Sequence, residues 1–155
     1  MVNIMNIDVK IKKIQKDFYY DFTIPDYATT GSAGMDLHAC IKEPVVIKKG
    51  HICKIPTGIA IYIKDRNVGG FVFPRSGLAS KHGISLANAV GVIDSDYTGE
   101  IICPLINHSE VDYVVNPGDR IAQIVFLPVY CANLIITDKL EETERGTGGF
   151  GSTGK

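Results

Sequence analysis

The sequence predicts an all-β protein, an antiparallel sandwich or barrel with one short helix, and three observations support that prediction. Short runs of apolar and β-branched residues recur along the chain, as strands require. Glycine and proline separate these runs, which is typical of antiparallel β folds rather than of alternating strands and helices. With 155 residues, 45% of them apolar and 21% charged, the chain has the composition of one soluble domain with a core.

The first predicted strand lies in residues 7–14, where apolar residues alternate with lysines. Val9 and Ile11 are expected on one face of this strand. Lys10 and Lys12 are expected on the other, solvated face. The apolar runs that follow are separated by turn residues. The further predicted strands are residues 58–63, 70–73, 84–93, 100–107 and 120–129.

Residues 74–83 are the one stretch predicted to be helical. Pro74 suits the first position of a helix, because a backbone N–H has no intrahelical partner there. Small and helix-tolerant residues follow it, and Gly83 is a typical stop signal. The stretch has room for about two turns at most.

The chain is predicted to form one domain, residues 1–140, followed by a flexible glycine-rich segment, residues 141–155. Phe150 is the only bulky apolar residue of that segment, which therefore cannot build a core. Residues 146–151 and 149–155 match two phosphate-binding motifs by letter. Both matches are rejected, because neither has the preceding strand and the following helix that those motifs need.

The same segment still offers groups that suit a nucleotide. Its glycine N–H groups can converge on an anion, and Arg145 can grip a phosphate with two hydrogen bonds. Ser152 and Thr153 add hydroxyl donors. Phe150 can stack on a nucleobase. The alternative, an unstructured tail with an incidental phenylalanine, stays open.

Charge and cysteine usage exclude several classes of protein. A net charge of −1 provides no basic field, so neither nucleic acid nor a membrane is predicted as a partner. The sequence shows no secretory signal and no apolar run of about 18 residues. The cysteines lie in apolar contexts without the paired spacing of metal sites, which predicts buried, reduced thiols and a cytoplasmic location. They are Cys40, Cys53, Cys103 and Cys131.

Polar clusters occur at the ends of predicted strands and in loops, at residues 33–37, 74–79, 88–100, 118–123 and 145–154. Motif by motif and in this order, they resemble the trimeric deoxyuridine triphosphate nucleotidohydrolases (dUTPases). Met35 departs from the family pattern, which often has an aromatic residue there, but methionine also fills apolar gaps. The resemblance implies a jelly-roll-like subunit, a homotrimer, and hydrolysis of dUTP to dUMP and pyrophosphate with Mg²⁺.

The resemblance also implies a role for individual residues around the nucleoside. Asp94 would be the catalytic residue, orienting a water for in-line attack on the α-phosphorus and accepting its proton. Tyr97 would lie against the sugar and leave no room for a 2′-hydroxyl. The resemblance implies that residues 88–100 form a hairpin that holds the nucleoside, and Asp96 is assigned to support of that hairpin or of an interface. The residues implied to line the base are Asn88, Val92, Ile93 and Ile102.

On the phosphate side, the resemblance places Arg75, Ser76 and Gly77 on the triphosphate, at the start of the short helix. Gln123 would contribute a neutral amide nearby. Asp36 would organise the metal through water, with no direct protein ligand expected.

Two further inferences concern the outer parts of this site. For Arg120, a salt bridge across the trimer is the favoured interpretation. The resemblance also implies a lid that closes over the bound nucleotide, formed by Arg145, Phe150 and Gly151.

Three other classes of protein share parts of this pattern. A dCTP deaminase of related fold shares the RSG-like motif and the hairpin, but its chemistry needs a glutamate near the base, where this hairpin offers Asp94. A jelly-roll interaction protein would use the same loops for partner contacts, and the cysteine usage and the phosphate-like tail argue against it. A regulatory nucleotide-binding protein on the same scaffold is not excluded by the sequence.

Overall fold

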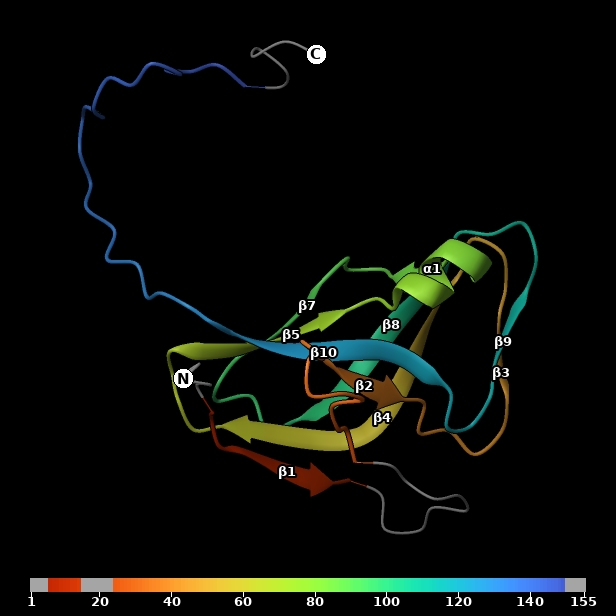
Figure 1. Cartoon of the computed structure of the whole chain (residues 1–155). Coiled ribbons are helices and arrows are strands. Elements are labelled where there is room, and N and C mark those ends of the chain that lie inside the picture. The colour runs from red at the N-terminus through yellow and green to blue at the C-terminus, as the bar shows by residue number, and fades with distance from the viewer. Residues whose placement is uncertain (1–5, 15–23, 150–155) are drawn as a thin grey trace.

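The computed structural model of the chain describes residues 6–14 and 24–149, and Figure 1 shows how their elements are arranged. Two residues of the predicted site, Phe150 and Gly151, lie outside the described residues. The strand pairings are antiparallel. The elements are β1 (Val9–Lys13), β2 (Met35–His38), β3 (Val45–Ile47), β4 (Ile52–Ile63), β5 (Val68–Phe73), α1 (Ser76–His82), β6 (Ile84–Leu86), β7 (Gly91–Ile93), β8 (Glu100–Asn107), β9 (Tyr113–Val115) and β10 (Arg120–Pro128).

Two four-stranded sheets form the body of the protein. One has the strand order β1-β4-β8-β6 and the other β2-β10-β5-β7, while β3 and β9 form a two-stranded sheet. Both large sheets contribute to one core: Ile55, Ile63 and Leu105 come from the first. Leu37 and Ile124 come from the second. Each such buried side chain stabilises the fold by about 1.5–3 kcal/mol. The predicted mostly-β fold with one short helix is confirmed.

The apolar run at residues 84–93 forms two strands, so its prediction as a single strand is wrong. A turn separates them, in which Ala89 has φ 60° and donates its N–H to the Leu86 carbonyl at 3.0 Å. A positive φ is uncommon for a residue with a side chain, and nothing in the local composition announces it. As a result β6 joins the first sheet and β7 the second.

The predicted helix is present and ends where expected. Gly83 follows it in the left-handed region at φ 67° and donates its N–H to the carbonyls of Ala79 and Leu78, which is a common way for a helix to end. The helix begins at Ser76 with Arg75 as its N-cap. Pro74 therefore lies outside the helix rather than at its first position.

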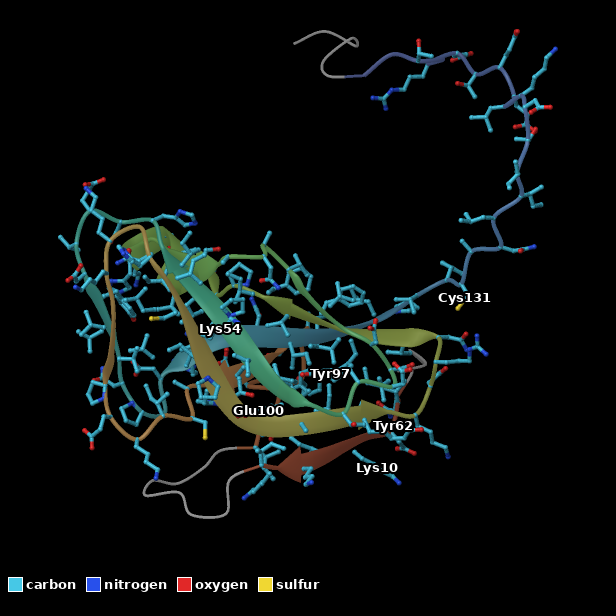
Figure 2. The ribbon with its side chains drawn as sticks, turned by 180° about the vertical axis from the view of Figure 1, so that it is seen from behind. Lys10, Lys54, Tyr62, Tyr97, Glu100 and Cys131 are labelled. Carbon is cyan, nitrogen blue, oxygen red and sulfur yellow. The ribbon has the colours of Figure 1, made fainter. Side chains whose placement is uncertain are left out.

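No disulfide joins the four cysteines, all of which lie in the described residues, but they are not all buried. Cys40 and Cys103 are buried, and burial raises the pKa of the Cys103 thiol to about 12. Cys53 is half-buried. Cys131 is exposed, so the prediction of a buried thiol is wrong there. It lies just after β10, where the chain leaves the body (Figure 2).

Beyond β10, residues 130–149, called here the C-terminal arm, extend away from the two sheets (Figure 1). The arm has no helix or strand, yet it carries large apolar side chains that are 81–98% exposed. They are Tyr130, Leu134, Ile135, Ile136 and Leu140. So many exposed apolar residues on one segment are typical of a surface that meets a partner. In the described part of the chain, no helix has the length and hydropathy needed to cross a membrane.

Asn107 is a fully buried polar residue whose loss should weaken the fold. Its Nδ2 donates to the carbonyls of Ile47 (2.9 Å) and Val111 (2.8 Å), and its Oδ1 accepts from the N–H and hydroxyl of Ser109 (2.9 and 2.7 Å). Asn107→Ala should lower the free energy of unfolding by about 2–4 kcal/mol, because it leaves buried groups unpaired. Denaturant unfolding followed by circular dichroism measures this, with exposed Asn6→Ala as control. Equal stability of the two variants would contradict it.

Candidate active site

A surface pocket of about 280 Å³ opens between β7 and β8. Glu100, a carboxylate that the sequence analysis did not assign to the site, is part of its lining. The structure therefore brings together the residues implied to hold the nucleoside, although they come from separate strands and the turn between them. The predicted residues that line the pocket are Asn88, Val92, Ile93, Asp94, Tyr97 and Ile102.

Backbone groups face this pocket from both strands. β7 is the edge strand of its sheet and pairs with β5 on one side. β8 pairs with β6 over residues 105–107, and in the described chain no strand covers residues 100–103 on that side. Free N–H and C=O groups at a strand edge can pair with an added group as they would with another strand. The pocket thus offers a hydrogen-bonding edge with an apolar lining.

The hairpin predicted for residues 88–100 is wrong in its pairing, because β7 and β8 belong to different sheets. The segment between them begins with a turn, in which Tyr97 donates its N–H to the Asp94 carbonyl at 3.1 Å. The turn breaks the alternation of an extended chain, so Asp94 and Asp96 are not placed on one face by strand geometry. Asp94 is exposed at the pocket, where a carboxylate can meet both ligand and water.

A second group of predicted residues gathers around Asp36. Arg75 donates from Nε to Asp36 Oδ1 at 2.8 Å and from Nη2 to Oδ2 at 3.5 Å. Arg120 donates from Nη1 to Oδ2 at 3.3 Å. Within its own chain Arg120 therefore pairs with Asp36, whereas the salt bridge predicted for it was one across the trimer, which stays a prediction. Two guanidinium groups around one carboxylate leave a net positive charge, and the half-buried Arg75 is held in a fixed orientation.

Gln123 belongs to this second group. It lies opposite Asp36 in the pairing of β10 with β2, and its Nε2 donates to the Pro74 carbonyl at 3.0 Å. A hollow of about 560 Å³ next to it is lined by Asp36, Pro74 and Gln123, among others. Ser76 and Gly77 begin α1, so their N–H groups have no partner within the helix.

His38, which is not among the predicted site residues, lies beside the same arginines. Its Nδ1 is buried and has no hydrogen-bond partner in the described chain. Burial lowers the pKa of His38; Asp36 opposes that shift, and Arg120 and Arg75 add to it. Lowering this pKa favours the neutral form of the His38 imidazole, so Arg75 and Arg120 supply the positive charge of the cluster around Asp36.

The third predicted group, the lid, is only partly described. Arg145 is exposed on the C-terminal arm, where its Nε donates to the Gly148 carbonyl at 2.9 Å. Phe150 and Gly151 lie outside the described residues. Within one chain, the predicted residues thus fall into three places: the pocket beside β8, the cluster around Asp36, and the arm. Together with the fold, they define an antiparallel β protein with a surface pocket large enough for a small molecule.

Comparison with known proteins specifies this class further. The dUTPase family model matches residues 20–154. The deoxyuridine 5′-triphosphate nucleotidohydrolase of Desulfitobacterium hafniense (strain DSM 10664 / DCB-2) is 54% identical over 149 residues, which are 96% of this chain and 97% of the relative. The protein of the same name from Coxiella burnetii (strain RSA 493 / Nine Mile phase I) is 49% identical over 151 residues, 97% and 99% of the two chains. The chain belongs to the dUTPase family, which confirms the predicted resemblance and the enzyme class, dUTP diphosphatase.

Solved structures agree with the fold. A mutant dUTPase of phage 80alpha has a TM-score of 0.82 at 25% identity, covering 98% of this chain and 99% of the other. Another mutant of that phage enzyme, solved with dUpNHpp, has a TM-score of 0.79 at 23% identity, with 96% and 99% coverage. A dUTPase mutant of the Staphylococcus aureus phage phi11, described with a structural Mg(II) ion, has a TM-score of 0.75 at 20% identity, with 87% and 99% coverage.

Proposed function

We propose that this protein hydrolyses dUTP to dUMP and pyrophosphate, limiting uracil incorporation into DNA and supplying dUMP for thymidylate synthesis. Membership in the dUTPase family supports the activity. The observation that carries the substrate assignment is the pocket between β7 and β8, where the open edges of two strands face one hollow. A uracil edge has the alternating acceptors and donor that such a backbone edge can satisfy.

In this proposal the deoxyuridine occupies that pocket. The backbone at Val92 and Ile93 pairs with the base, with Ile102 from β8 and Asn88 also lining the cavity around it. A close fit rejects the thymine methyl group sterically, and Tyr97 lies against the sugar. The position of these residues around one hollow supports the assignment.

Asp94 acts as the general base. Its carboxylate orients a water in line with the α-phosphorus and accepts the proton as the new oxygen–phosphorus bond forms and the bond to the departing pyrophosphate breaks. Its exposed place at the pocket supports this role, since a solvent molecule can reach it. Proximity and orientation, rather than covalent chemistry, then account for most of the rate.

The triphosphate is bound by Arg75, Gln123 and the N–H groups of Ser76 and Gly77. Both carboxylate oxygens of Asp36 accept hydrogen bonds from arginines, which fits the expectation that it organises Mg²⁺ through water rather than as a direct ligand. Bound Mg²⁺ supplies charge neutralisation on the phosphates and keeps several of its waters.

We further propose a homotrimer in which each site combines groups from different subunits. The separation of the pocket, the Asp36 cluster and the arm within one chain supports a composite site. The exposed apolar side chains of the arm support its packing on a neighbour. Arg145, Phe150 and Gly151 then form a lid over the bound nucleotide, which excludes water from the reacting phosphate.

Release of pyrophosphate from dUTP, dCTP, dTTP and UTP, each with and without Mg²⁺, tests the function. We expect release from dUTP with Mg²⁺ and little from the others. Conversion of dCTP to a uracil nucleotide would instead identify a deaminase. Binding of dUTP without pyrophosphate release would identify a regulatory protein and reject the proposal.

Removing the Asp36 carboxylate should free Arg75 and weaken binding of the triphosphate. Asp36→Ala is expected to lower kcat/KM for dUTP by about 10–100-fold, mainly through KM, because a group that orients a binding residue is lost. Steady-state kinetics measure this, with the exposed carboxylate Asp8 replaced by alanine as the control. An unchanged KM would show that Arg75 does not depend on Asp36.

A further inference from the structure

The ring of Tyr97 is folded back onto the residues that follow it. Its hydroxyl donates to the Glu100 carbonyl at 3.0 Å. The ring also lies directly over Gly99: a Cβ built on that glycine would be 2.4 Å from the Tyr97 oxygen and 2.6 Å from Cζ. Contacts under 3.0 Å are not tolerated by carbon atoms, so the ring can occupy this place only because residue 99 has no side chain.

Glu100 is itself fixed by a second contact. Its Oε1 accepts the N–H of Gly58 at 2.8 Å. Gly58 has φ 72° and lies where the pairing of β4 with β8 changes register, between Pro56 and Ala60. The Glu100 carboxylate therefore supplies a hydrogen-bond partner to the backbone of β4 at this irregularity. Glu100 is also the first residue of β8, so this contact fixes the carbonyl that holds Tyr97 (both side chains are labelled in Figure 2).

Packing alone does not fix Tyr97, because the residue is 44% exposed. An exposed aromatic ring exchanges between rotamers rapidly unless something holds it. In the described structure two contacts restrain the ring: its close packing against the backbone of Gly99 and the hydrogen bond from its hydroxyl to the Glu100 carbonyl. A wall of a binding pocket excludes an extra hydroxyl group only if it cannot move aside.

We propose that Gly99 and Glu100 are positioning residues that hold the Tyr97 ring against the pocket and so determine how strictly ribonucleotides are rejected. This inference rests on the proposed function and deepens it, by naming the residues behind the sugar specificity. The Glu100 side chain acts on Tyr97 indirectly: its contact with the Gly58 N–H fixes the Glu100 backbone, and the Glu100 carbonyl in turn holds the Tyr97 hydroxyl. Neither Gly99 nor Glu100 needs to touch the sugar.

The test is the ratio of kcat/KM for dUTP to that for UTP. Gly99→Ala and Glu100→Ala are each expected to lower this ratio by about tenfold, the order of effect of losing one precise contact. Glu100→Gln should retain it, because the amide oxygen can still accept from Gly58. Gly31→Ala is the matched control, since a Cβ there meets nothing within 4 Å. Tyr97→Phe should lower the ratio, and adding Glu100→Ala to it should have no further effect.

Hydrogen exchange without nucleotide gives a readout independent of activity. The Gly58 amide should exchange faster in Glu100→Ala than in the wild type. In Glu100→Gln it should exchange at about the wild-type rate, because the amide oxygen still accepts its hydrogen bond. If Glu100→Ala fails to fold, the dUTP/UTP ratios of Gly99→Ala and Tyr97→Phe test the proposal instead. A wild-type dUTP/UTP ratio in folded Gly99→Ala or Glu100→Ala, or an equal loss with both substrates, would overturn the proposal. A wild-type protein that releases no pyrophosphate from dUTP would instead refute the proposed function.

Discussion

Replacing Asp94 with asparagine is expected to lower kcat for dUTP hydrolysis by about 10²–10⁴-fold while dUTP still binds, because the general base is lost. Asparagine has nearly the same shape, and the turn that carries Asp94 depends on its backbone carbonyl, which accepts from the Tyr97 N–H. The pocket should therefore keep its form. Steady-state kinetics give kcat, and calorimetry with a non-hydrolysable dUTP analogue gives the binding constant.

Asp96→Asn provides a matched control for this experiment. Asp96 is an exposed carboxylate in the same turn, but it does not line the pocket. Its replacement removes one negative charge only two residues away from Asp94. Because Asp96 is exposed and does not line the pocket, this change should alter kcat by less than about threefold. Near-normal kcat in Asp94→Asn, or equal losses in both variants, would show that Asp94 is not the general base.

The fold class could be predicted from sequence because strand patterns are local. Residues 100–107, a short and largely apolar run, match β8 in both bounds. Three short strands, β2, β3 and β9, were not predicted, because three or four residues carry too little pattern and depend on their partners. The division of residues 84–93 was also missed, since it depends on the positive φ of Ala89.

The candidate site shows the same division between local and long-range information. Residues around the turn at Asp94 line one pocket. By contrast, Asp36 is 39 positions from Arg75 and 84 from Arg120, so no spacing rule could pair them. Glu100 was missed for a related reason, because its partner Gly58 lies 42 positions away. Only the register of β4 with β8 brings these two residues together.

Deletion of residues 145–155 is expected to leave a folded oligomer that hydrolyses dUTP at least about 100-fold more slowly. The core is built by residues of the β-strands and the segments between them, up to Ile124, so the truncated protein should unfold at the wild-type temperature. The apolar side chains of the arm from Tyr130 to Leu140 also remain, and subunit association should be kept. What is lost is the proposed lid, and with it the exclusion of water and the positioning of the phosphates.

Two shorter changes separate the parts of this effect. Deleting residues 152–155 keeps Arg145, Phe150 and Gly151, so it should have a much smaller effect than the full deletion. Phe150→Ala should act mainly on KM if the ring stacks on the base, by about 1–3 kcal/mol. Thermal unfolding, sedimentation and pyrophosphate release are measured for each variant. Loss of folding or of the oligomer in the 145–155 deletion would show that the segment has a structural role, and full activity would show that the lid is not part of the mechanism.

The arm leaves the body at the end of β10 and extends away from it (Figure 1). In the proposed homotrimer it can therefore reach a neighbouring subunit. Mixed oligomers of the deleted chain and an Asp94→Asn chain should therefore regain activity, since an intact lid from one subunit can close over an intact Asp94 of another.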